Sequence, residues 1–192
     1  MTDLVIKELS LHFPLILFFA FLIVWIVITY KVGDWQNWRH YYPTILFFWC
    51  GDLIYNVLFC EKPLWQFKNA VFSHELTDII CMFIVFTCTV LMYIPWFPKT
   101  FKKQVLYIGY WVLLYTGIEW LFHTLGGITY HNGWSVKLSL VHNIYQFLLL
   151  KLHHHKPILA WVLALIILVL VASSYKIDVT AASKIMDRIH LF

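Results

Sequence analysis

Charged residues are scarce in this sequence, at 12% of 192 residues, whereas a soluble domain usually has about 25%. This scarcity excludes an ordinary soluble fold, because 61% of the residues are hydrophobic and 19% are aromatic. So many aromatic side chains exceed what one soluble core of this size can bury, but in a bilayer they can face lipid or gather at its interfaces. The formal charge of +4 is small and scattered over short loops. It argues against a nucleic-acid partner and predicts contact with a lipid bilayer.

Standard catalytic motifs are missing as well. The sequence contains no HExxH, GxSxG or P-loop pattern, so the usual signatures of zinc proteases, serine hydrolases and nucleotide-binding proteins are absent. The four cysteines form no CxxC pair, and three of them lie in apolar runs. We interpret them as small buried residues, with a disulfide or a zinc site as the alternative.

Six apolar runs approach the length of about 20 residues that a helix needs to cross a membrane. They lie at 13–32, 43–60, 73–94, 104–125, 135–152 and 157–175. Pro14, Pro43 and Pro157 stand where helices are expected to begin, and Pro95 and Pro98 where one ends. The sequence predicts an all-α, polytopic integral membrane protein, a single-domain bundle of about six transmembrane helices. A short interfacial helix is expected at 183–192.

Basic residues give a weak indication of orientation. Those in the loops between runs are more numerous on one side (Lys31, Arg39, Lys99, Lys102, Lys103, Lys151 and Lys156) than on the other (Lys62, Lys68 and Lys137). The first side is therefore expected in the cytoplasm, with both chain ends outside. Self-association into a homo-oligomer is a further expectation, because six helices make a small bundle.

Polar side chains concentrate in the four central runs. Three pairs are spaced by four residues, which places both members on one helix face: Asp52 with Asn56, His74 with Asp78, and Glu119 with His123. The fifth run carries His142, Asn143 and Gln146 after Ser135 and Ser139. Ionisable groups in a membrane span usually face the protein interior, and often for function.

The depth of these residues agrees from helix to helix. At a rise of about 1.5 Å per residue, Asp52, Asp78, Glu119 and His142 all lie roughly 8–12 Å below the same membrane surface. This agreement predicts a polar pocket that opens toward loops 61–72 and 126–134. His131, Asn132 and Trp134 would stand at its mouth, and Trp65 with Trp134 could form its rim.

Two kinds of chemistry fit such a pocket. Glu119 and Asp78 are the candidate catalytic carboxylates, and His74, His123 and His142 are candidate ligands of a divalent metal (Zn, Fe or Mn) or proton relays. Asp52, Asn56 and Asn143 would orient these side chains from a second layer around the site.

A metal- or proton-dependent site acting on a small or lipid-derived ligand is the leading hypothesis. A proton- or cation-coupled carrier or pH sensor is one alternative. A non-catalytic scaffold, in which these groups only join helices, is the other.

Several strings in the chain are distinctive together: DWQNWRHYYPTILFFWCGDLIYN, FTCTVLMYIPWFPK, ITYHNGW and HKPILAW. With them the sequence resembles an uncharacterised family of small multi-pass membrane proteins of spore-forming bacilli and clostridia. The resemblance covers nearly the whole chain after the first run. It implies a helical protein of the bacterial cytoplasmic membrane and no particular activity or site residue.

Overall fold

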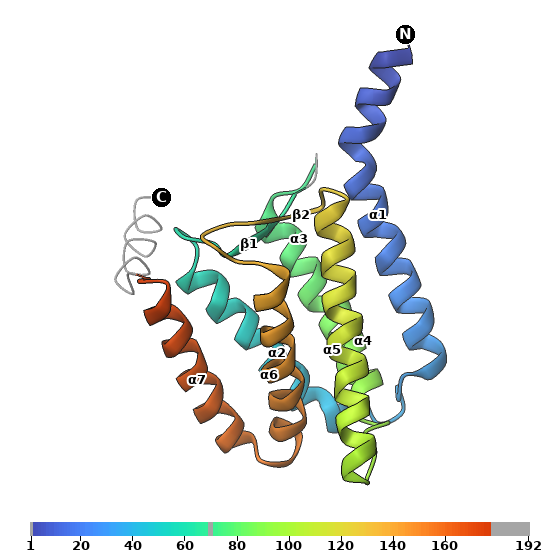
Figure 1. Cartoon of the computed structure of the whole chain (residues 1–192). Helices are drawn as coiled ribbons and strands as arrows, with labels where there is room; N and C mark the ends of the chain where they lie inside the picture. Colours follow the sequence, from blue (N-terminus) through green and yellow to red (C-terminus); the bar gives the residue numbers. More distant parts are fainter. Residues whose placement is uncertain (1, 69–70, 178–192) are drawn as a thin grey trace, which may run out of the picture.

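The computed structural model describes residues 2–68 and 71–177, so the interfacial helix predicted at 183–192 lies outside the described residues. The described part is mostly helical, with six helices (Figure 1). Four helical stretches in it are long and apolar enough to cross a membrane: His12–Val32, His74–Tyr93, Phe101–Thr124 and Pro157–Ser174. Such spans suggest a multi-pass membrane protein in contact with a lipid bilayer.

The helix bounds follow the apolar runs but differ at two prolines. Five helices are α1 (Thr2–Val32), α2 (Trp38–Leu58), α5 (Phe101–Thr124), α6 (Val136–His155) and α7 (Pro157–Ser174). The sixth, which we call the composite helix, joins α3 (His74–Cys81), the π-helix η1 (Met82–Phe86) and α4 (Thr87–Tyr93). Pro157 does begin a helix, and α4 ends before Pro95.

Pro14 and Pro43 lie inside α1 and α2, so the helix starts predicted at 13 and 43 are wrong. A proline removes one backbone hydrogen bond, and a long helix can tolerate that loss when the chain on both sides is helical. The predicted start of the third run, at residue 73, agrees with the structure, in which α3 begins at His74. Ser73 caps α3, because its side-chain oxygen accepts a hydrogen bond from the backbone N–H of Leu76 at 3.3 Å.

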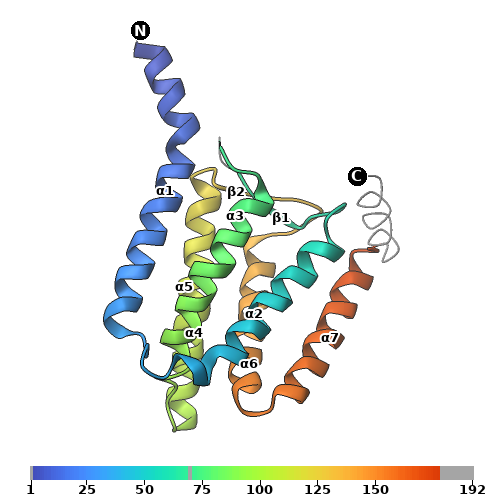
Figure 2. The ribbon, with the colours of Figure 1, turned by 180° about the vertical axis from the view of Figure 1, so that it is seen from behind.

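A small sheet departs from the all-α prediction. The two loops expected at the pocket mouth supply strands β1 (Trp65–Phe67) and β2 (Ile128–Tyr130). They pair antiparallel, with Trp65 opposite Tyr130 and Phe67 opposite Ile128. The sheet lies at the same end of the bundle as the start of α1 and the end of α7 (Figures 1 and 2).

An aromatic core fills the bundle away from the sheet. Tyr93 of α4 and Phe147 of α6 are both 0% exposed, with ring centroids 5.1 Å apart. The Tyr93 hydroxyl donates to the Phe147 carbonyl oxygen at 2.9 Å. Trp111 of α5 and Trp25 of α1 pack edge to face beside them, so this cluster joins four helices. α1 and α7 form opposite edges of the bundle (Figure 2).

Candidate functional site

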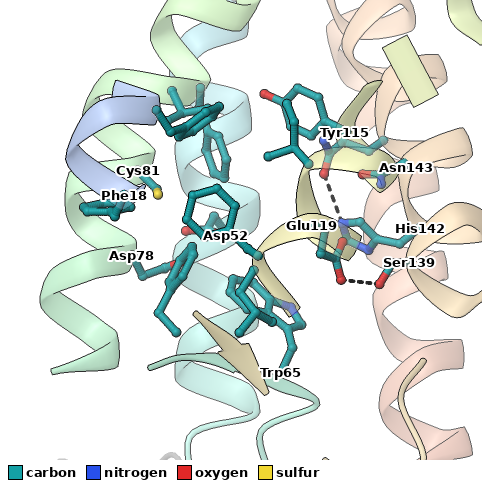
Figure 3. A pocket seen from close by; sticks show the side chains of 18 of the residues that line it. Phe18, Asp52, Trp65, Asp78, Cys81, Tyr115, Glu119, Ser139, His142 and Asn143 are labelled. Atoms are coloured by element: carbon teal, nitrogen blue, oxygen red, sulfur yellow. Dashed lines mark hydrogen bonds between the residues drawn. The ribbon is translucent and has the colours of Figure 1, made fainter. Parts of the chain in front are cut away.

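A cavity of about 150 Å³ lies between the aromatic core and the sheet (Figure 3). Its walls come from α1, α2, the composite helix, α5, α6 and both strands, and most of them are apolar. We call it the first cavity. Its polar wall consists of Asp52, Asp78, Glu119, Ser139, His142, Asn143 and Gln146. The four residues that the sequence placed at equal depth therefore all line one cavity.

The acidic wall from α2 and α3 is built around Asp78, which is 3% exposed. The Asn56 side-chain amide donates to Asp78 Oδ2 at 2.5 Å, and also to the backbone oxygen and Oδ2 of Asp52 at 3.1 and 3.4 Å. Asn56 thus bridges the two carboxyl groups. The second oxygen of Asp78, Oδ1, is buried and receives no hydrogen bond from the described residues. A buried acceptor without a donor is costly, so this atom is a place where a ligand can gain a hydrogen bond.

The composite helix changes its winding next to Asp78. Residues Met82–Phe86 form a π-helix. Cys81, directly before it, and Val85 and Phe86 within it line the first cavity. Short π-helical segments inside α-helices are rare and occur frequently at functional sites, because they contain one extra residue and displace the side chains that follow.

The opposite wall is organised around Glu119 of α5. Its Oε1 accepts a hydrogen bond from the Tyr130 hydroxyl at 2.9 Å. It also accepts one from the Ser139 hydroxyl, which Figure 3 shows. The indole N–H of Trp134 donates in turn to Ser139 Oγ at 2.9 Å. Burial, followed by the negative charge of Glu119, raises the pKa of the Tyr130 hydroxyl, which therefore stays a donor. Both hydrogen bonds fall on Oε1, and no described residue donates to Oε2.

The three histidines predicted as ligands or relays are each tied to near neighbours. His142 uses both ring nitrogens, with Tyr145 Oη at 2.5 Å and Gln146 Oε1 at 3.0 Å. His123 Nδ1 contacts the Ile128 carbonyl oxygen at 3.1 Å, and the backbone N–H of Phe67 donates to His74 Nδ1 at 3.2 Å. Only His142 lines the first cavity.

The metal arrangement expected from the sequence is therefore not formed in the described part of the chain. No group of three or more His, Cys, Asp or Glu side chains there could hold a metal ion. The physical reason is local: each predicted histidine ligand has at least one ring nitrogen hydrogen-bonded to a backbone or side-chain partner close to it.

Of the three residues predicted at the pocket mouth, one lines the cavity and two do not. Trp134 lines the first cavity, whereas His131 and Asn132 line no described cavity and are exposed. Asn132 adopts a positive φ of 53° in the turn before Gly133, and its amide donates to the Pro63 carbonyl oxygen at 2.7 Å. His131 pairs with the Thr129 hydroxyl at 3.0 Å. Both residues shape the connection to the sheet.

A second cavity, of about 160 Å³, lies between α2, α6 and α7. It shares a wall with the first cavity, formed by Asp52, Trp65, Trp134, His142 and Gln146. Its remaining lining is apolar or aromatic, apart from the hydroxyls of Tyr55 and Tyr145. Nothing in the sequence predicted this second cavity.

Sequence reasoning also missed His153, near the end of α6. It is 5% exposed, its Nδ1 lies 3.1 Å from the Thr44 hydroxyl, and its ring stacks on Phe47 with centroids 4.3 Å apart. The signal was its spacing, since His153 follows Phe147 and Leu150 at intervals of three residues on the buried face of α6.

Comparison with protein-family models, curated proteins and solved structures finds no match to this chain.

Proposed function

We propose that this chain is a six-span membrane protein that binds a small or lipid-derived ligand in the first cavity and exchanges a proton at its acidic wall. The observation that carries the proposal is Asp78: a carboxyl group 3% exposed, on a cavity wall inside the bundle, with one oxygen that no described donor reaches. A buried carboxyl group that lacks a donor at one oxygen can take up a proton there or accept a hydrogen bond from a ligand. Ligand binding and proton exchange are therefore linked at this residue.

Spanning by α2 and α6 is part of the proposal. Their 21 and 20 residues correspond to about 30 Å, which matches the hydrocarbon core. Their polar residues lower their mean hydropathy, but Asp52, Ser139 and Asn143 face the first cavity rather than lipid. Together with the four apolar spans they support six crossings. The family resemblance of the sequence supports a bacterial cytoplasmic membrane.

Binding is favoured over passage through the bundle. The first cavity lies on the sheet side of the aromatic core. The side chains of Tyr93, Trp111 and Phe147 in that core are 0%, 5% and 0% exposed, so they block a path from the cavity to the other end of the bundle. The described residues form no metal cluster, so the proposal uses the carboxyl groups without a metal.

Saturable binding of a neutral probe tests this function. Nanodiscs containing the full chain are dialysed against phenylbutanol, and empty nanodiscs correct for partition into lipid. Val85, 5% exposed, lines the first cavity, so Val85→Trp should fill it and abolish binding. Val141→Trp is the matched control, because Val141 is 55% exposed and lines neither cavity.

A second filling variant and a measurement of proton exchange complete this test. A second filling variant, Ile118→Trp, covers the case in which Val85→Trp does not fold. A pH indicator in weakly buffered samples should report a proton change on binding to the wild type and none for Asp78→Asn. The proposal fails if no saturable binding is found, or if both filling variants bind as well as Val141→Trp.

A further inference from the structure

The walls of the two cavities carry acidic groups without a matching cation. Asp52, Asp78 and Glu119 line the first cavity, Asp52 also lines the second, and no lysine or arginine among the described residues lines either. His142 does not balance them, because both of its ring nitrogens are engaged on its own helix. Like charges confined in a low-dielectric site favour the entry of an opposite charge.

Two acceptor atoms are available to such a charge. Asp78 Oδ1 is buried on the α3 side without a donor, and Glu119 Oε2 on the α5 side receives no hydrogen bond from the described residues. An ammonium group offers up to three N–H donors and no acceptor, so it matches these two carboxylate oxygens, which only accept.

Aromatic rings complete the surroundings of these acceptors. Trp65 and Trp134 stand in the wall that both cavities share, and Phe67 and Tyr115 line the first cavity. Aromatic faces attract cations, most strongly where water is excluded, and tryptophan attracts them best. The combination of carboxylates and aromatic rings is therefore selective for an organic cation over a neutral molecule.

The second cavity supplies a place for an apolar tail and a way in from the membrane. It lies directly behind the shared wall, and its lining is largely apolar. Two of its lining residues are exposed, Gly51 of α2 and Leu165 of α7 at 49%. Because they lie within the lengths of two helices that we propose to cross the membrane, this cavity opens toward lipid and not toward water.

Building on the proposed function, we infer that the joined cavities bind an organic ammonium compound with an apolar tail. The ammonium group lies between Asp78 and Glu119, beside the tryptophans of the shared wall. The tail extends through that wall into the second cavity and enters between α2 and α7. The ligand class is a lipophilic amine.

Three probes of equal size test the charge that the site recognises: phenylbutylamine, phenylbutanol and phenylbutyrate. Binding to nanodiscs with the full chain is measured by dialysis at neutral pH, with empty nanodiscs subtracted. The amine should bind at least roughly tenfold more tightly than the alcohol, because a hydrogen bond to a charged group contributes about 1.5–3 kcal/mol. The carboxylate probe should bind most weakly. Asp78→Asn and Glu119→Gln should each remove most of the amine's advantage over the alcohol, measured as the ratio of the two affinities of the same variant.

A glycine pair tests the route of the tail. A side chain at Gly51 would meet no atom within 4 Å, so Gly51→Phe should fold and occupy the second cavity. It should weaken amine binding roughly tenfold, since burial of several methylene groups is lost. Gly117 is also helical with no atom within 4 Å, and it lines neither cavity, so Gly117→Phe should have no effect.

The outcomes separate this inference from the proposed function. Equal binding of amine and alcohol, or tightest binding of the carboxylate, overturns the ammonium site while the ligand cavity stands. Equal effects of Gly51→Phe and Gly117→Phe overturn the position of the tail. If none of the three probes binds saturably, the proposed function fails together with the inference.

Discussion

Replacing Asn56 by leucine should destabilise the protein mainly through its effect on Asp78. The Asn56 amide is the one N–H donor to Asp78 among the described residues, at 2.5 Å from Oδ2, and Oδ1 already lacks one. Asn56→Leu therefore leaves a carboxyl group that is 3% exposed without an N–H donor. An unsatisfied buried polar group costs about 1–3 kcal/mol, so we expect the free energy of unfolding to fall by about 2 kcal/mol.

The double variant separates this cause from general loss of packing. Asp78→Leu removes the group that needs a donor, and the Asn56 amide keeps its hydrogen bonds to Asp52 at 3.1 and 3.4 Å. Replacing both partners by apolar residues of similar shape can be nearly neutral. Asn56→Leu with Asp78→Leu should thus be more stable than Asn56→Leu alone, with a coupling energy of about 1 kcal/mol or more.

Reversible unfolding of the full chain in mixed micelles, followed by circular dichroism, measures these energies. Asn143→Leu is a matched control, because Asn143 is 4% exposed and donates to a neutral partner, the Thr116 hydroxyl, at 3.0 Å. It should cost about 1 kcal/mol. Additive costs for Asn56→Leu and Asp78→Leu would refute the reasoning, since they would mean that the two side chains do not depend on each other.

Three further predictions concern other parts of the bundle. Thr44→Val should lower the free energy of unfolding by about 1–3 kcal/mol in the same assay, because it leaves buried His153 without its partner at 3.1 Å; an unchanged value would show that the pair is not formed. Gly33→Ala should destabilise by about 1–3 kcal/mol, since its Cβ would stand 2.6 Å from a backbone carbonyl oxygen one turn earlier, whereas Gly117→Ala, with no atom within 4 Å, should not destabilise. A membrane-impermeant maleimide added to intact cells should label exposed Cys60 and spare the two buried cysteines; labelling only after lysis would reverse the orientation predicted from the basic residues.

The cavity was predictable because it depends on regular helical geometry. A fixed rise of about 1.5 Å per residue converts positions in the sequence into depths. Asp52, Asp78, Glu119 and His142 agreed in depth, and all four line the first cavity. Helix existence was predictable for the same reason, since apolar runs of spanning length leave few other structures.

The partners of those side chains were not predictable, because they depend on contacts that have no sequence period. Each strand of the sheet is three residues long, too short for an alternating pattern, and their pairing joins segments more than 60 residues apart. Tyr130 becomes a donor to Glu119 only through that pairing. His142 could have turned toward the carboxylates, but Tyr145 and Gln146 on its own helix satisfy it first.

The π-helix at Met82–Phe86 sets the angular relation between the two halves of its helix. Its extra residue lets Asp78 face the first cavity while Tyr93, further along, is locked into the aromatic core. If all the residues of this segment were wound as an ordinary α-helix, the extra residue would rotate one half against the other by about 100°. Either the carboxyl group or the tyrosine would then leave its place, so the π-helix allows a single helix both to pack in the aromatic core and to line the first cavity.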